Sequence, residues 1–246
     1  MLGLPESTRA CLFDLDGVVT KTALVHAAAW KEMFDDFLRQ HAAATGTEFV
    51  PFDAVGEYDR YVDGKPRLDG TRSFLQARGI TLPEGSPDDP PTAQTVNGLS
   101  NRKNALVLEM IDKHGVEVYQ GSVRYIKAVR EAGLKTAVVS SSANTVQVLQ
   151  VSGFAGLFDT RIDGVVAKQR GLAGKPAPDT YLAAAADLHV APAQAAVFED
   201  ALAGVESGRA GHFGLVVGVD RTGQAAELAK HGAVVVVRDL AELLDK

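Results

Sequence analysis

The stretch Cys11-Leu12-Phe13-Asp14-Leu15-Asp16-Gly17-Val18-Val19-Thr20 carries an apolar run into two carboxylates and a glycine. Residues i and i+2 of a strand point to the same face, so the spacing predicts that Asp14 and Asp16 share one side. Two acids at the end of a buried strand repel each other and lose hydration unless a cation or a partner meets them. A hard cation such as Mg²⁺, which prefers oxygen ligands, would suit them. From this stretch alone, a strand that ends in a capping Asp with a second Asp in a turn is the simpler explanation.

The composition of the chain narrows the classes of protein that it can be. The 246 residues are 46% hydrophobic and 23% charged, with a net charge of −6, which suits a globular protein of one domain or of a domain with a smaller companion. The acidic balance argues against nucleic acid or an anionic membrane as a partner, although a few local Lys and Arg residues still allow a phosphorylated substrate. The single cysteine, Cys11, cannot form an internal disulfide, so we expect a reducing, cytoplasmic location. We also expect neither a signal peptide nor a membrane span.

The block 22–116 is predicted to be mostly helical and to contain no strand. Alanines and apolar residues recur at intervals of three and four in its first part, as in an amphipathic helix. The stretch 81–97 holds four prolines and is expected to be irregular. The predicted helices cover residues 23–41, 68–78 and about 101–114.

Short apolar strands alternate with helices in the rest of the chain. The predicted strands cover residues 9–15, 135–139, 158–162, 195–198, 213–217 and 233–237. The helices between them cover residues 122–133, 144–150, 178–186, 201–210 and 224–230. This alternation predicts an α/β fold with a doubly wound, Rossmann-like parallel sheet, in which ligands bind at the carboxyl ends of the strands. We therefore expect residues 1–21 and 117–246 to form an α/β catalytic core, with residues 22–116 inserted as a helical cap domain.

Polar residues follow several of the predicted strands, where they can converge on one edge of the sheet. They are Asp14, Asp16, Ser140, Glu199 and Asp200, and Lys175 lies in the loop 174–179. Three kinds of group, carboxylate, hydroxyl and ammonium, together with a bound Mg²⁺, fit phosphoryl transfer. A carboxylate attacks phosphorus, the cations neutralise charge, and Ser and Lys hold the phosphoryl oxygens.

The order of these motifs resembles the haloacid dehalogenase superfamily, through Asp14-Leu15-Asp16-Gly17-Val18, Ser140, Lys175-Pro176 and Glu199-Asp200. The resemblance implies that Asp14 is a nucleophile that forms an aspartyl phosphate and that Asp16 is the general acid/base. It also implies that Asp14, the backbone carbonyl of Asp16 and Asp200 bind Mg²⁺, with Glu199 nearby or ligating. Dehalogenases of the superfamily lack the second Asp, so Asp16 favours phosphate chemistry.

Within the superfamily, the block 22–116 resembles that of the β-phosphoglucomutase-like subfamily, which includes phosphosugar phosphatases. The resemblance implies a small phosphorylated sugar as substrate. The positions that match sugar- or phosphate-binding residues are Thr22, His26, Trp30, Lys65, Arg67, Lys103, Ser142 and Asn144. The mutases usually carry Lys where this chain has Ala143, a departure that puts the grip on the distal phosphate in question.

Two enzyme functions and one non-enzymatic function follow from these motifs. The first is a mutase that interconverts β-glucose 1-phosphate and glucose 6-phosphate, and the second is a phosphatase of a small phosphometabolite, which Ala143 favours. The third is a phospho-acceptor signalling domain of the receiver type, which would leave the insertion 22–116 without a purpose. Individually, His26 and Trp30 would also suit a packed helix face, and Lys175 a solvated surface. We expect the protein to act as a monomer.

Overall fold

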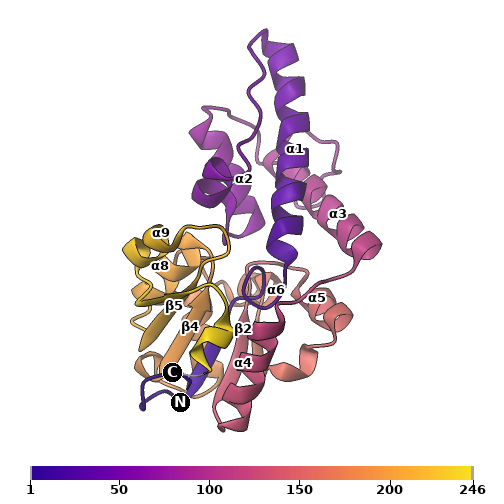
Figure 1. Cartoon of the computed structure of the whole chain (residues 1–246). Helices are drawn as coiled ribbons and strands as arrows, with labels where there is room; N and C mark the ends of the chain where they lie inside the picture. Colours follow the sequence, from indigo (N-terminus) through magenta and orange to yellow (C-terminus); the bar gives the residue numbers. More distant parts are fainter. Residues whose placement is uncertain (1, 245–246) are drawn as a thin grey trace. The chain divides into compact units, whose positions relative to one another are not determined.

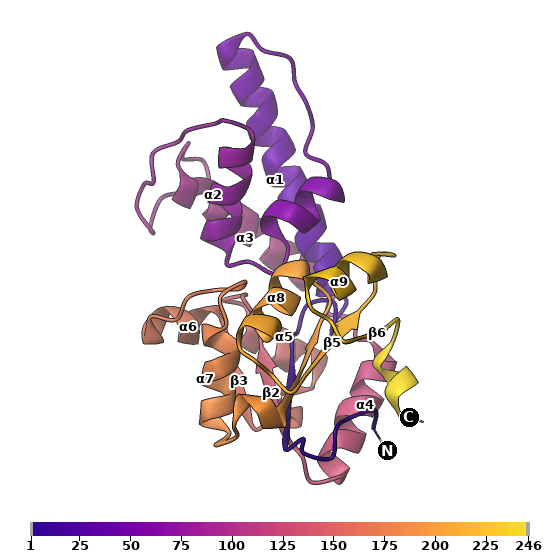
Figure 2. The ribbon, with the colours of Figure 1, turned by 90° about the vertical axis from the view of Figure 1, so that its left-hand side faces the viewer.

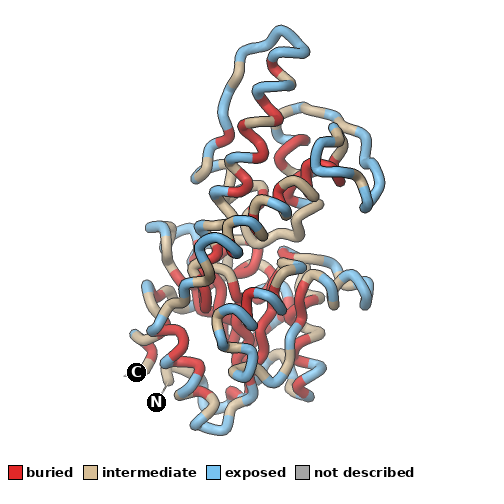
Figure 3. The backbone as a smooth tube through the Cα atoms, turned by 90° about the vertical axis from the view of Figure 1, so that its right-hand side faces the viewer, coloured by how far each residue is buried: buried red, intermediate tan, exposed pale blue. Residues whose placement is uncertain are grey.

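The computed structural model describes residues 2–244. They divide into two compact units, one of residues 2–22, 64–66 and 116–244, the other of residues 23–63 and 67–115. Each unit has a buried core of its own, which Figure 3 shows as runs of buried backbone. The short segment 64–66 belongs to the first unit although both of its neighbours in the chain belong to the second.

The first unit is built on a six-stranded parallel sheet (Figure 1). Its strands are β1 (Ala10–Phe13), β2 (Lys135–Val139), β3 (Thr160–Ile162), β4 (Ala195–Glu199), β5 (Leu215–Val219) and β6 (Val235–Val237). The order across the sheet is β3-β2-β1-β4-β5-β6, and every pairing is parallel. The first strand therefore lies in the middle, at the point where the order reverses, which is where doubly wound sheets bind ligands. The predicted fold class is confirmed.

Helices cover both faces of this sheet (Figure 2). They are α4 (Gln120–Glu131), α5 (Thr145–Ser152), α6 (Gly164–Arg170), α7 (Asp179–Asp187), α8 (Leu202–Ala210) and α9 (Ala225–His231), with short 3₁₀ turns at Ala155–Leu157, Pro192–Gln194 and Leu240–Leu243. Successive residues of β1 face opposite layers, as the pleat requires. Leu12 belongs to the cluster that also contains residues of α7, α8 and α9, whereas Phe13 stacks on Phe198 and meets Tyr125 of α4. The apolar runs of these strands reflect burial on both faces.

The second unit is helical, as predicted, and its described residues contain no strand. Its elements are α1 (Thr22–Thr45, whose first residue belongs to the first unit), the π-helix η1 (Tyr58–Val62), α2 (Arg67–Ala77) and α3 (Val96–His114). Aromatic side chains fill its core: the ring of Phe34 lies 5.1 Å from Trp30, 5.1 Å from Phe52 and 4.0 Å from Phe74, between centroids. Among residues 2–244, no helix has both the length and the apolar character that crossing a bilayer requires.

Several predicted element boundaries were wrong. Helix α3 begins at Val96 and not near residue 101, because the Thr95 side chain accepts a hydrogen bond from Gly98 N and caps the helix. Helix α6 was not predicted; the carboxylate of Asp163 caps its first turn. Strand β1 ends at Phe13, so Asp14 and Asp16 lie in the following loop and not in the strand.

Candidate active site

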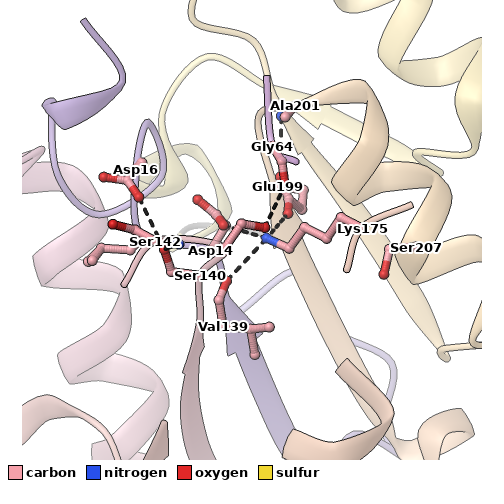
Figure 4. Close-up of polar contacts among 12 residues, drawn as sticks. Asp14, Asp16, Gly64, Val139, Ser140, Ser142, Lys175, Glu199, Ala201 and Ser207 are labelled. Atoms are coloured by element: carbon pink, nitrogen blue, oxygen red, sulfur yellow. Dashed lines mark hydrogen bonds and ion pairs between the residues drawn. The ribbon is translucent and has the colours of Figure 1, made fainter. Parts of the chain in front are cut away.

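Asp14 follows the central strand directly and meets a buried lysine. Its backbone N–H donates to Phe198 O at 3.0 Å, which continues the β1–β4 pairing by one bond. The ammonium of Lys175 donates to Asp14 Oδ1 at 2.5 Å, to Glu199 Oε1 at 2.6 Å and to Val139 O at 3.1 Å (Figure 4). The ammonium has three protons, so all of its donors are used. Lys175 is therefore no solvated surface residue: its side chain is 1% exposed.

The charges of this cluster shift the pKa values of its members. Burial raises the pKa of the Asp14 carboxyl above its ordinary value; Lys175 opposes this shift, and the neighbouring carboxylates Glu199 and Asp16 add to it. Burial by itself would lower the pKa of Lys175, but the two carboxylates that it contacts outweigh burial and raise that pKa. Lys175 is accordingly a fixed positive charge, since an ammonium between two anions holds its proton.

Asp16 is held by two hydroxyl groups of the same unit. Thr22 Oγ1 donates to Asp16 Oδ1, and Ser140 Oγ donates to Asp16 Oδ2 at 3.2 Å. Ser140 in turn accepts the backbone N–H of Ser142 at 3.1 Å, so the turn after β2 fixes its hydroxyl. Thr22 thus contacts Asp16 in the structure, and its predicted contact with substrate stays a prediction.

Three carboxylates converge at a place where a cation would fit. Oxygens of Asp14, Glu199 and Asp200 lie within 4.8 Å of one another, and all three residues are buried. Lys175 contacts two of these acids, Asp14 and Glu199, and a divalent cation among the three carboxylates would offset their mutual repulsion. The donor set is all oxygen, which suits Mg²⁺. Gly17 makes this grouping possible: its φ is +93°, and a Cβ there would lie 1.7 Å from Asp200 Oδ2.

Residues outside the predicted site hold Glu199 and the backbone next to the other carboxylates. The hydroxyl of Tyr181 donates to Glu199 Oε1 at 2.8 Å. From the loop after β5, Arg221 Nε donates to Gly17 O at 2.8 Å and Gln224 Nε2 donates to Asp200 O at 3.1 Å. The sequence carries little signal for these roles, because an aromatic residue on a helix face and polar residues in a loop have many simpler explanations.

Other predicted site residues lie in the second unit. Lys103 Nζ lies 2.7 Å from His26 Nδ1 and 4.9 Å from the centroid of the Trp30 ring, so these three residues form one cluster. Arg67 begins α2; its Nε is buried with no hydrogen-bond partner in the described chain, and burial lowers the pKa of its guanidinium.

The remaining predicted residues lie in the first unit. Ser142 Oγ accepts the backbone N–H of Asn144 at 3.1 Å, in the turn before α5. Lys65 lies in the segment 64–66, which is joined to the turn after β2 by a 2.7 Å hydrogen bond from Ser141 Oγ to Gly64 O. The substrate-binding roles of all these residues stay predictions.

Comparison with known proteins identifies the family. The family model of haloacid dehalogenase-like hydrolases matches residues 8–212. The chain belongs to this family. It is 58% identical over 247 residues to the β-phosphoglucomutase of Mycobacterium bovis, an alignment that covers 99% of this chain and 94% of the relative. The β-phosphoglucomutase of Bacillus subtilis is 30% identical, with 96% and 91% covered. The predicted superfamily and its β-phosphoglucomutase-like branch are thus confirmed.

A solved structure agrees with this assignment at the level of the fold. The β-phosphoglucomutase structure from Clostridium difficile superposes with a TM-score of 0.73, covers 96% of this chain and 93% of its own, and is 24% identical. The haloacid dehalogenase-like chain is therefore an enzyme, a sugar-phosphate mutase or a phosphatase of this family.

Proposed function

We propose that this haloacid dehalogenase-like enzyme is a Mg²⁺-dependent phosphotransferase that interconverts β-glucose 1-phosphate and glucose 6-phosphate. The observation that carries the proposal is the 58% identity, over nearly the whole chain, to a relative named β-phosphoglucomutase. The buried cluster around Asp14 supports the chemistry of phosphoryl transfer. A cytoplasmic location and a monomeric state stay predictions.

In the proposed reaction, Asp14 accepts the phosphoryl group. One of its carboxylate oxygens attacks phosphorus while the bond from phosphorus to the donor oxygen breaks, which leaves an aspartyl phosphate and an alkoxide that needs a proton. Lys175 holds its ammonium 2.5 Å from Asp14 Oδ1, where it can attract the negative charge of the transferring group. Burial makes this attraction stronger than it would be in water.

Asp16 handles the proton in the proposed reaction. When protonated, it gives its proton to the leaving sugar oxygen; as a carboxylate, it then takes the proton of the sugar hydroxyl that attacks the aspartyl phosphate, and the cycle closes without a net proton. The hydroxyls of Thr22 and Ser140 keep this carboxyl in place. A carboxyl so held can serve as acid and base without reorienting.

Residues of the first unit would hold the metal. Asp14 and Asp200 are the proposed side-chain ligands, with the backbone carbonyl of Asp16 and with Glu199 beside them or ligating. When bound, Mg²⁺ supplies positive charge that offsets the negative charge of the phosphoryl oxygens.

Cations of the second unit are the proposed partners of the phosphate that is not being transferred. The buried Nε–H of Arg67 donates a hydrogen bond to no described residue. A guanidinium binds phosphate well because its planar donors match the phosphate oxygens. Lys103 is 4% exposed and lies against His26, the proposed partner of the attacking hydroxyl.

A phosphatase of a small sugar phosphate is the alternative, favoured by Ala143, which brings no cation to the turn after β2. It would use Asp14 and Asp16 in the same roles, with water in place of the second sugar hydroxyl. The two functions therefore differ in the acceptor and not in the nucleophile.

One assay tests the proposal and separates it from the alternative. The chain is incubated with Mg²⁺, β-glucose 1-phosphate and a trace of glucose 1,6-bisphosphate, and both glucose 6-phosphate and free phosphate are followed, with Asp14→Asn as the inactive control. Glucose 6-phosphate without free phosphate is expected. Free phosphate alone would make the chain a phosphatase. If neither glucose 6-phosphate nor free phosphate formed, the glucose assignment would be overturned.

A further inference from the structure

Tyr181 is a buried phenol directly beside the proposed catalytic cluster. It is the third residue of α7 and is 0% exposed. Its hydroxyl donates to Glu199 Oε1 at 2.8 Å, and its ring centroid lies 5.0 Å from Lys175 Nζ. Phe213 meets the same ring edge to face, at 6.0 Å between centroids. Packing therefore holds the ring in place, with its hydroxyl directed at Glu199.

Within the part of the chain that the structure describes, the carboxylate of Glu199 accepts three hydrogen bonds. Oε1 accepts from both Lys175 Nζ, at 2.6 Å, and the Tyr181 hydroxyl, while Oε2 accepts from Ala201 N at 3.2 Å. Glu199 is 0% exposed, so these donors replace hydration that the carboxylate would have in bulk solvent. The phenol is the neutral donor among the side chains that hold this buried anion, and it adds no charge to the cluster.

The hydroxyl of Tyr181 affects the position of the Lys175 ammonium between the carboxylates of Asp14 and Glu199. The ammonium contacts Asp14 and Glu199 at nearly equal distances, 2.5 and 2.6 Å. Without the phenol, Glu199 would lose one of its donors and draw the ammonium more strongly, away from Asp14. Asp14 and its phosphoryl group would then lose part of the positive charge that the proposed transfer needs.

We propose that Tyr181 is a positioning residue, whose hydroxyl anchors Glu199 and thereby keeps the Lys175 ammonium on Asp14 during phosphoryl transfer. This inference rests on the proposed phosphotransfer chemistry and adds to it a residue outside the motif set. Tyr181 touches neither substrate nor phosphorus in this role. It acts through Glu199 and Lys175.

The chain offers a matched pair of substitutions for the test. Tyr181→Phe removes only the hydroxyl and keeps the ring contacts. Tyr125→Phe removes the hydroxyl of another tyrosine that is 0% exposed in the same unit and donates to a backbone carbonyl, Leu2 O, at 2.8 Å. Each variant loses one hydrogen bond of a buried tyrosine and keeps its ring, so a purely structural effect should be similar in the two.

Two readouts are measured on the full chain. In steady-state turnover with Mg²⁺, Tyr181→Phe is expected to lower kcat about 10-fold with KM within about twofold, while Tyr125→Phe leaves kcat within about twofold. In thermal unfolding, the probe is Mg²⁺ with beryllium fluoride, which forms a tetrahedral adduct on a carboxylate and stands for the aspartyl phosphate. The rise in Tm that this probe causes should be smaller in Tyr181→Phe than in either the wild type or Tyr125→Phe.

Each outcome decides the inference. If Tyr181→Phe and Tyr125→Phe lost kcat and the probe-induced rise in Tm equally, or if Tyr181→Phe lost neither, the role proposed for Tyr181 would be overturned. If the wild type turns over no sugar phosphate, the proposed function fails, while the beryllium fluoride shift still tests Tyr181. A wild type that responds to neither substrate nor probe would overturn both.

Discussion

The ammonium of Lys175 lies between two buried carboxylates, so removing it should affect both stability and activity. Lys175→Met leaves Asp14 and Glu199 as neighbouring buried anions without their cation. Without added metal, we expect a loss of about 3–5 kcal/mol in the free energy of unfolding. We also expect turnover with Mg²⁺ to fall about 10²–10³-fold, because the transferring phosphoryl group loses a preorganised positive charge.

Lys21 provides the matched control for this substitution. It also pairs with a carboxylate, that of Glu117, at 2.7 Å, but on the exposed surface. Lys21→Met should leave turnover and the denaturation midpoint close to those of the wild type. In an exposed ion pair, solvent screening and the loss of side-chain entropy offset most of the favourable Coulomb energy. Urea unfolding and turnover of both variants provide the comparison. A Lys175→Met chain as active as Lys21→Met would contradict the role given to Lys175.

At the residue scale, the sequence was informative where several polar residues stood at the ends of strands. Asp14, Ser140 and Glu199 could be placed near one another because parallel strands end at one edge of a sheet, whereas Lys175 lies in the loop between α6 and α7 and was indicated by its Lys-Pro motif. Tyr181 could not be found in this way: its ring belongs to the core, and only the position of one hydroxyl reveals another role.

The loop after β1 depends on a glycine, and substitution there should disturb the carboxylate cluster. Gly17→Ala introduces a Cβ 1.7 Å from Asp200 Oδ2 at a φ of +93°. We expect turnover to fall at least about 10-fold, because Asp200 must move and the carboxylates no longer fit one cation. The Mg²⁺ concentration for half-maximal turnover should rise as well.

Gly153 separates this effect from backbone strain. It ends α5 at a φ of +77°, and a Cβ there would meet nothing within 4 Å. Gly153→Ala should cost about 1 kcal/mol of stability, measured by urea unfolding, and leave the Mg²⁺ dependence of turnover unchanged. If both variants shifted the Mg²⁺ dependence equally, strain alone would explain Gly17.

Among the elements, most strands could be predicted because burial on both faces of the sheet makes them uniformly apolar. Most helices could be predicted because their apolar residues recur at intervals of three and four. The boundaries were harder. Thr95 ends a proline-rich stretch, where a capping residue looks like a loop residue in the sequence, so helix α3 begins about five residues before its predicted start. The short helix α6 begins at the cap Asp163, and its seven residues carry no apolar periodicity that would have predicted a helix.

At the level of the whole molecule, each of the two units has a buried core of its own, and a cavity in one core should leave the other largely intact. Phe34 lies among aromatic rings of the second unit and is 0% exposed. Phe34→Ala should destabilise that unit by about 3–5 kcal/mol. In limited proteolysis, early cuts are expected within residues 23–63 and 67–115, before cuts in the sheet unit.

Leu12 gives the reciprocal variant, since it is buried in the core of the sheet unit. Leu12→Ala should reverse the order of cutting, with early cleavage in residues 116–244. Peptide mapping by mass spectrometry reads both results. If the two variants gave the same order of cuts, the two units would unfold as one.

Trapping the phosphoryl group on the protein identifies the residue that receives it. The chain is mixed with Mg²⁺ and glucose 1,6-bisphosphate, quenched in acid within one turnover and mapped by mass spectrometry. The proposed role of Asp14 as nucleophile predicts a phosphoryl group on the peptide that contains Asp14, and none there in Asp14→Asn. A phosphoryl group on another residue, or turnover with no phosphorylated peptide in either chain, would contradict it.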